Sequence, residues 1–347
     1  MEWRPADGGN PAALLTAFLD GTGLTTPQSA EHGDVAVTVL VGAAGCAALA
    51  GLPLPAPSPV DVPELVAVAV ERSGEPAPAA TAPVLGEWRT SWTDAEHADA
   101  VSAVRQAIAR GDVYQANVVG HRSAPHRSDP YDVARAVADV PAAYGGLLTG
   151  EGWAVGCASP EQLVRTRGRR ITTEPIKGTS RDREQLRVSA KDRAEHVMIV
   201  DLERNDLARV AVTGSVQVER LYELQDWNGL WHAHSTVAAE LREGATVLDV
   251  LRAVAPGGSV TGAPKRAATQ LLAGLEPVGR GPAMGAFGFV WAGGMDLGLT
   301  IRTVAADEDS VHLWAGGGIT WGSDPEQEVA EAHAKAEPVL RALGPAL

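Results

Sequence analysis

A lysine between an apolar pair and a glycine is the first candidate for chemistry in this sequence. Residues 173–179 read Thr-Glu-Pro-Ile-Lys-Gly-Thr, so Pro175 and Ile176 precede Lys177 and Gly178 follows it. An ammonium group held away from water loses its proton more easily, and the free amine is a nucleophile. A lysine at a strand end that reaches into solvent would account for the same residues. Lys177 alone therefore leaves both interpretations open.

Two pairs of acidic residues are spaced three positions apart, which places both carboxylates of a pair on one face of a helix. Asp192 and Glu195 form the first pair, and Glu328 and Glu331 form the second, with Lys335 on the same face. Charged pairs on helices are usually solvated, so one pair alone means little. If the two helices face each other across a cleft, their carboxylates offer the oxygen ligands that Mg²⁺ prefers.

Two glycine-rich segments would let backbone amides approach an anion. Residues 256–265 read Pro-Gly-Gly-Ser-Val-Thr-Gly-Ala-Pro-Lys, and Pro264 is expected to be the first residue of a helix whose N-terminus attracts anions. Residues 315–319, Ala-Gly-Gly-Gly-Ile, form the second segment. Neither segment has the spacing of a nucleoside triphosphate loop. Together with Lys177, Arg302 and the acidic pairs, they predict a site for a dianionic small molecule.

The elements that must position these residues follow from periodicity and turn signals. Helices are expected at 12–19, from a capping box at Thr93 and Glu96 to Gly111, at 190–207, at 264–275 and from Asp324 onward. Strands are expected at 35–41, 65–70, 113–119, 153–158, 162–167, 170–174, 215–219, 232–238, 286–291 and 297–304. In the last strand Arg302 should project from the face opposite the apolar residues. Pro338 should bend or end the last helix.

Length and composition limit the class of protein. With 347 residues and 45% hydrophobic content, the chain can bury a large core, as one large domain or two closely packed lobes. It has neither a long apolar run nor a basic start, so we expect a cytoplasmic protein without a membrane segment. The net charge of −14 argues against nucleic acid as a partner. Cys46 and Cys157 lack a metal-binding spacing and are expected to be buried.

The composition also changes along the chain. Residues 1–87 are rich in Ala, Gly and Pro, offer no polar site chemistry and end in a Pro/Ala-rich linker. We expect this N-terminal portion to pack on a catalytic core that comprises residues 88–347.

The motifs of that core, in unbroken order, resemble those of the chorismate-utilising enzymes. The matching segments are 111–117, 159–161, 175–179, 192–207, 232–236, 257–265, 301–303, 316–319 and 323–328. The resemblance implies an α/β (α+β) fold like that of anthranilate synthase component I. It has a two-layer sandwich of antiparallel sheets, outer helices and an active site in the central cleft.

The residue types at two positions distinguish the reactions that members of that family catalyse. Isochorismate and salicylate synthases have a water-activating lysine where this chain has Gln115, and anthranilate synthases typically have an alanine where it has Lys177. Lys177 instead resembles the lysine of aminodeoxychorismate synthase component I, which attacks C2 of chorismate before ammonia adds at C4. The resemblance therefore implies 4-amino-4-deoxychorismate as product, and the alternatives are an anthranilate synthase component I or a catalytically idle chorismate-binding subunit.

The same resemblance implies roles for the other site residues. Glu161 would be the general acid, and His196 would be structural. The metal would be Mg²⁺, held by Glu195, Glu328, Glu331 and Asp192. The substrate would be bound by Gln115, Thr179, His234, Thr261, Arg302, Gly317, Gly318 and Lys335.

Some positions depart from the family pattern. Ala283 stands where relatives usually have a tyrosine that contacts the enolpyruvyl carboxylate, and Asp192 stands where glutamate is common. The portion before Trp88 lacks a Leu-Leu-Glu-Ser signature, so feedback control by tryptophan is not expected. A glutaminase nucleophile motif is also missing. A separate glutamine amidotransferase subunit is therefore the expected source of ammonia.

Overall fold

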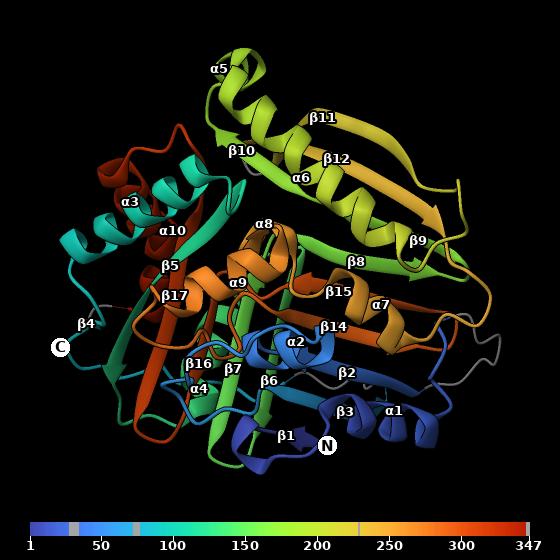
Figure 1. The fold of residues 1–347 in the computed structure, drawn as a ribbon. Coiled ribbons are helices and arrows are strands. Elements are labelled where there is room, and N and C mark those ends of the chain that lie inside the picture. Colours follow the sequence, from blue (N-terminus) through green and yellow to red (C-terminus); the bar gives the residue numbers. More distant parts are fainter. Residues whose placement is uncertain (28–34, 72–76, 228–229, 345–347) are drawn as a thin grey trace.

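Two antiparallel sheets packed face to face form the frame of the protein. The computed structural model describes residues 1–27, 35–71, 77–227 and 230–344 (Figure 1). Helices cover the outer faces of both sheets, and the main apolar core lies between them. The α/β fold predicted from the sequence, with antiparallel sheets and outer helices, is confirmed.

The first sheet has ten strands on its main path and its branch, within the described residues. Its order is β1 (Glu2–Trp3), β3 (Leu65–Glu71), β2 (Val35–Val41), β14 (Ala286–Trp291), β15 (Gly294–Leu299), β8 (Gln162–Arg167), β9 (Arg170–Glu174), β12 (Leu230–Glu240) and β10 (Ile176–Ser180), with β11 (Gln217–Trp227) paired to β12. The outer face of this sheet carries α1 (Pro11–Thr22), α2 (Ala43–Ala50), α7 (Val247–Val254), α5 (Arg183–Val188) and α6 (Ala190–Ala208).

The second sheet has seven strands in the same described part of the chain. Its order is β13 (Gly262–Ala263), β5 (Gln115–Pro125), β17 (Ser310–Ile319), β16 (Thr303–Ala306), β7 (Trp153–Ser159) and β6 (Tyr144–Gly150), with β4 (Arg89–Thr90) paired to β5. The helices around it are α3 (Asp94–Arg110), α4 (Pro130–Ala138), α8 (Gly258–Thr261), α9 (Lys265–Ala273) and α10 (Pro325–Leu343).

The two sheets approach each other closely at two glycines, each of which faces an aromatic ring of the opposite sheet. A Cβ on Gly146 of β6 would lie 2.5 Å from the ring of Phe287 on β14, and one on Gly298 of β15 would lie 2.5 Å from Tyr144. These glycines therefore let an aromatic side chain of the opposite sheet pack against backbone.

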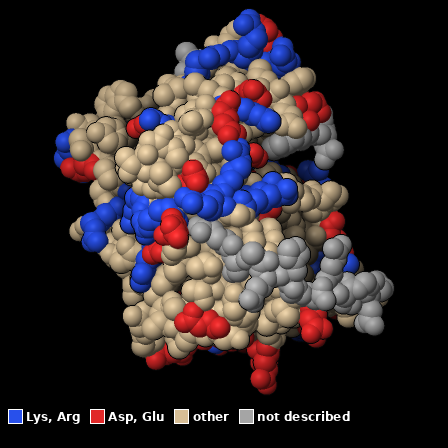
Figure 2. All heavy atoms as spheres, turned by 90° about the vertical axis from the view of Figure 1, so that its right-hand side faces the viewer, with Lys and Arg blue, Asp and Glu red and all other residues tan. Residues whose placement is uncertain are grey.

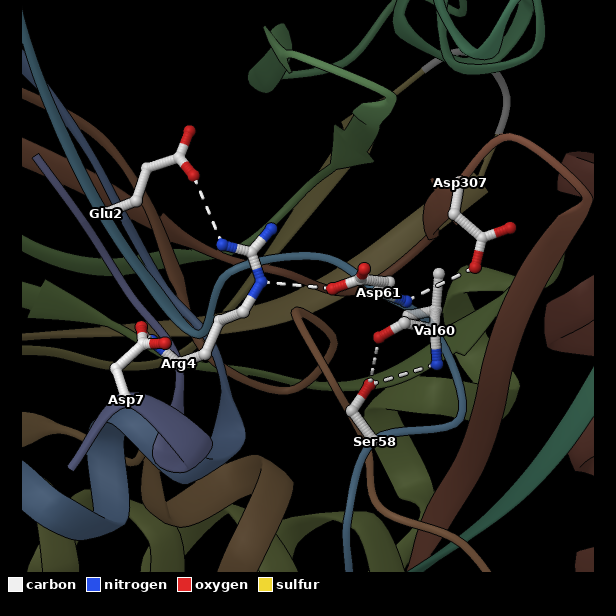
Figure 3. Close-up of polar contacts among 7 residues, drawn as sticks. All are labelled: Glu2, Arg4, Asp7, Ser58, Val60, Asp61 and Asp307. Carbon is white, nitrogen blue, oxygen red and sulfur yellow. Dashed lines mark hydrogen bonds and ion pairs between the residues drawn. The ribbon is translucent and has the colours of Figure 1, made fainter.

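The N-terminal residues join both layers. Strand β2 pairs with β14 along its whole length, so the first residues of the chain extend the larger sheet. Figure 3 shows Arg4 pointing at Glu2 and at Asp61, whose Oδ1 lies 3.0 Å from Nε of Arg4. The backbone N–H of Asp61 donates to Oδ2 of Asp307, which follows β16 of the second sheet.

Several predicted boundaries are wrong, for identifiable reasons. The strand expected at 297–304 is two strands in different sheets, because the chain leaves the first sheet after Leu299 and Arg302 adopts a φ of 50°. Arg302 therefore lies in a crossover and not on a strand face. Pro264 is the N-cap residue of α9 instead of its first residue. Helix α10 continues through Pro338 to Leu343.

Basic side chains gather in a band on the face that Figure 2 shows. At the turn between β8 and β9, Arg167, Arg169 and Arg170 are exposed. Arg169 pairs with Glu240 and Arg170 with Glu219, so part of this charge is neutralised locally. Within the described residues, no helix is long and apolar enough to cross a membrane.

Candidate functional site

A cavity of about 470 Å³ lies where the two sheets exchange strands. Its charged lining residues come from distant parts of the chain. They are Glu161, Lys177, Glu195, Arg302, Glu328, Glu331 and Lys335. The structure thus brings together the lysine, the candidate acid and three of the four carboxylates that the motifs had singled out.

Two neighbouring crossovers place Glu161 and Arg302 at this cavity. Glu161 lies where the chain passes from β7 in the second sheet to β8 in the first, and Arg302 lies where it returns from β15 to β16. The crossovers are hydrogen-bonded to each other, because Leu299 N–H donates to the carbonyl of Glu161 at 3.0 Å and Ala158 N–H donates to that of Arg302 at 3.1 Å.

Glu161 has the environment of a carboxylic acid that keeps its proton. Its side chain is buried, and its Oε1 accepts a hydrogen bond of 3.0 Å from Oγ of Ser259. Burial raises the pKa of Glu161, while the charge of Lys177 and the bond from Ser259 lower it. Because burial dominates, the structure favours the protonated form more than water would.

Lys177 shows the opposite shift for the same reason. It lies on β10, which pairs with β12, and its side chain lines the cavity. Desolvation lowers the pKa of Lys177, the charge of Glu161 raises it, and the ammonium of Lys335 lowers it. A lysine with a lowered pKa is more often present as the free amine, which is the nucleophilic form.

The candidate metal ligands come from two helices on the same cavity. Glu195 lies on α6, and Glu328 and Glu331 lie on α10. A Cβ on Gly317 would lie 3.0 Å from Oε2 of Glu328, so a glycine lets this carboxylate approach the strand. Lys335 lies 2.6 Å from Oε1 of Glu331.

The carboxylates share the cavity without converging on one point. Among the side chains that the structure describes, no group of three or more His, Cys, Asp or Glu is arranged to hold a metal ion. The side chain of Asp192, the fourth predicted ligand, lies outside the described part of the structure.

Positive charge is supplied by Arg302 and Lys335. The Arg302 side chain is exposed to the cavity, and desolvation by the surrounding protein lowers its pKa, although a guanidinium remains charged. Lys335 donates to the carbonyl of Gly316 at 3.0 Å. Both cations line the same cavity.

The other predicted substrate-binding residues divide into two groups. Gly318 lines the cavity, whereas Gln115, His234, Thr261 and Gly317 do not. These four lie on elements that border it, and the side chains of Gln115, His234 and Thr261 are buried. The side chain of Thr179 lies outside the described part of the chain. The helix predicted at 264–275 contributes no lining residue, and α8 before it supplies two.

Several lining residues were not predicted from the sequence. The polar ones are Asn117, His232 and Ser259, and the apolar ones include Ile176, Val260, Met284, Ile301, Leu313 and Trp314. Ser259 lies inside the glycine-rich segment that was singled out because its backbone amides could approach an anion. Its hydroxyl group could have been recognised as a further polar group of the site. Asn117 lies within the strand predicted at 113–119, two residues after Gln115, and both side chains are buried.

Comparison with known proteins agrees with the arrangement. A family model described as chorismate binding enzyme matches residues 57–341. Anthranilate synthase component 1 of Streptomyces coelicolor is 40% identical over 287 residues, which cover 78% of this chain and 56% of that protein. Aminodeoxychorismate synthase component 1 of Bacillus subtilis is 35% identical over 270 residues, covering 74% and 57%. This chain thus spans little more than half the length of these relatives.

A solved structure supports the same relationship. The crystal structure of anthranilate synthase component I from Streptococcus pneumoniae matches with a TM-score of 0.80 and 26% identity, over 93% of this chain and 84% of that one. The family resemblance predicted from the motifs is therefore confirmed, and the chain belongs to the family of chorismate binding enzymes.

Proposed function

We propose that this protein acts on chorismate as the component I subunit of an aminodeoxychorismate synthase and produces 4-amino-4-deoxychorismate. The observation that carries the proposal is the position of Lys177 beside Glu161 in a cavity that holds both cations and carboxylates. Burial shifts the pKa of the amine down and that of the acid up. A nucleophile and a proton donor are therefore favoured in the same site.

The first step would form a covalent adduct. The free amine of Lys177 attacks C2 of the ring, the two ring double bonds shift toward C4, and the bond from C4 to its hydroxyl oxygen breaks. Glu161 gives its proton to that oxygen, so water leaves and the Glu161 carboxylate remains. Arg302 and Lys335 would hold the substrate's carboxylates through charge-assisted hydrogen bonds.

The second step would release the lysine. Ammonia attacks C4, the double bonds shift back, and the bond between C2 and the Lys177 nitrogen breaks. The new C4 ammonium passes one proton to the Glu161 carboxylate, which restores the acid. Splitting one difficult displacement into two easier displacements lowers the barrier that each step must cross.

A magnesium ion is also part of the proposal, supported by the chemistry of the carboxylates that line the cavity and not by their present arrangement. Glu195, Glu328 and Glu331 offer carboxylate oxygens from α6 and α10, with Asp192 on the first turn of α6. Oxygen ligands of this kind suit Mg²⁺, which keeps several waters and needs only a few carboxylates. When bound, the ion would neutralise a carboxylate of the substrate.

The ammonia source is proposed to be a separate glutamine amidotransferase subunit. The proposal is supported by the names of the relatives, each of which is component 1 of a synthase. Free ammonium at alkaline pH should replace that subunit in a test with this chain alone.

The test is to incubate the protein with chorismate, Mg²⁺ and ammonium and to identify the product by mass spectrometry. We expect aminodeoxychorismate, which yields para-aminobenzoate only after a lyase is added. Lys177→Ala should lose most amination at C4, and Lys177→Arg is the matched control that keeps the charge but not the nucleophile. Unchanged aminodeoxychorismate formation in both variants would falsify the assignment of Lys177.

The second candidate is an anthranilate synthase component I, which the 40% identity to the Streptomyces coelicolor protein favours. Fluorescent anthranilate and pyruvate, released without a second enzyme, would establish this alternative. A third outcome, binding of chorismate without turnover under any ammonia source, would identify a catalytically idle subunit.

A further inference from the structure

Part of the cavity lining is apolar and is assigned no role by the charged residues. Met284, Ile301, Leu313 and Trp314 belong to this part. Carboxylates and a hydroxyl group account for the polar atoms of the proposed substrate. Its ring and its vinyl ether also need a surface to pack against.

We propose that Trp314 is the substrate-contacting residue that sets the specificity of this cavity for a ring, a role that rests on the proposed function. Trp314 lines the cavity although only 2% of the residue is exposed. Most of its surface is therefore in contact with protein, and only a small part of the residue is left for a ligand.

The indole is held in place from several directions. Its Nε1–H donates to the carbonyl of Gly279 at 3.1 Å. The rings of His121 and His312 lie 5.0 and 5.9 Å from its ring, centre to centre. A Cβ on Gly281 would lie 3.4 Å from Cη2 of the indole. A side chain fixed in this way loses little conformational entropy when a ligand packs on it.

The two histidines behind the indole form a neutral support. Nε2 of His121 and Nδ1 of His312 lie 3.0 Å apart, and burial lowers the pKa of His121 to about 3 and of His312 to about 4. Both imidazoles are therefore uncharged near neutral pH. They contribute stacking rather than charge to the wall.

Trp314 directly precedes the glycine-rich part of its strand. Successive residues of a strand face opposite sides, so His312, Trp314, Gly316 and Gly318 alternate onto one face of β17. The first two carry rings, whereas the two glycines carry no side chain and line the cavity. Trp314 is therefore the last side chain on this strand face before the two glycines that line the cavity.

The loop that contacts Trp314 also reaches the cavity. Gly279 and Gly281 contact the indole, and Met284 of the same loop lines the cavity. Ala283, between them, is 1% exposed. The part of the substrate beside Trp314 and Met284 would be held by apolar contact.

The test uses steady-state kinetics and ligand-induced fluorescence changes of the intact protein with chorismate. Trp314→Leu should raise KM for chorismate by about tenfold while kcat changes much less, since an aromatic contact is lost and the reacting groups stay in place. Trp314→Phe keeps a ring and loses the hydrogen bond to Gly279, so its KM should lie between those of the wild type and Trp314→Leu. The matched control is Trp153→Phe, because Trp153 is also 2% exposed but does not line the cavity.

Fluorescence gives a second readout that a purely structural role would not affect. Chorismate should quench part of the tryptophan emission of the wild type and of Trp153→Phe, and this part should be missing in Trp314→Phe. Wild-type turnover with unchanged KM and quenching in both Trp314 variants would overturn this inference alone. A wild-type protein that neither binds nor converts chorismate would overturn the proposed function, and this inference with it.

Discussion

Glu64 offers a measurable link between burial and stability next to the cavity. Its side chain is 3% exposed and its Oε2 accepts a hydrogen bond of 3.0 Å from the backbone N–H of Ala44, at the first turn of α2. Ala43 N–H donates to the carbonyl of Gly281, which starts the loop that carries Met284 to the cavity. Burial raises the pKa of Glu64 from 4.5 to about 8, against the effect of hydrogen bonds from the backbone of Ala44 and Gly45.

The sign of the effect follows from which state holds the proton. Between about pH 4.5 and pH 8 the unfolded chain has released the proton of Glu64 and the native protein still holds it. The stability that Glu64 contributes is therefore full below the unfolded pKa and is lost as the pH rises through the native one. One pKa unit corresponds to about 1.4 kcal/mol, so the full change is about 5 kcal/mol.

Glu64→Gln isolates this contribution, because its amide oxygen can still accept from Ala44 and has no proton to lose. Urea unfolding of both proteins across the pH range gives a difference in the free energy of unfolding. We expect the wild type to lose about 1.4 kcal/mol per pH unit relative to the variant between about pH 5 and pH 8, and to level off above. Glu203, whose pKa burial also raises to about 8, is present in both proteins and cancels.

A constant difference across that range would refute the reasoning, since it would mean that burial does not raise the pKa of Glu64 in the native protein. A difference that instead grows in favour of the wild type below about pH 4.5, as the pH rises toward that value, would show that the backbone N–H groups outweigh burial. In that case Glu64 would be a charged cap of α2.

Three further predictions concern the cavity and its supports. Glu161→Gln should lower kcat by about 10²- to 10⁴-fold in steady-state assays, and Ser259→Ala should lower it less. Turnover by Glu161→Gln at the wild-type rate would exclude Glu161 as the acid. Arg280→Met should lower the free energy of unfolding by about 3–5 kcal/mol. It leaves the buried carboxylate of Glu276 without the guanidinium that lies 2.6 Å from it, and it removes the hydrogen bond to the carbonyl of Val260. Adding Glu276→Leu should recover part of the loss, and a single variant as stable as the wild type contradicts this account. Gly317→Ala should raise the Mg²⁺ concentration for half-maximal activity, because its Cβ meets Glu328, whereas the open Gly322→Ala should not. Equal Mg²⁺ dependence in both would count against Glu328 as a ligand.

Local signals in the sequence were sufficient for most of the elements. The strands predicted at 35–41, 162–167, 170–174 and 286–291 have the observed bounds, since each is an apolar or alternating run closed by turn residues. Thr93 and Glu96 form the predicted capping box of α3, and Gly111 ends that helix in a left-handed conformation. These features depend on neighbours in the chain, so they are readable without knowledge of the fold.

Features that depend on the partner surface were not readable in the same way. Gln115 and Asn117 alternate on β5 as the polar face of a half-exposed strand would, yet both are buried, because β13 and α8 cover them. Trp314 was not predicted as a lining residue, since its position depends on the loop at Gly279, far away in sequence. The motifs did anticipate the charged lining residues, although hydrophobic periodicity alone would not have joined them.

The break at Arg302 shows why periodicity misleads at this site in particular. Alternation of apolar residues continues across Leu299 and Thr303 because each half is a true strand, but the halves belong to different sheets. The residues between them must leave one sheet and enter the other. They do so beside the second crossover, at Glu161, where the chain passes from β7 to β8. Strand pairing cannot occupy the space between two diverging sheets, so the cavity opens there. Glu161 and Arg302, placed at paired crossovers, line that space, and Ser259 of α8 donates a hydrogen bond to Glu161. The site is therefore located by the topology that moves strands between layers, and the residue types at the crossovers determine its chemistry.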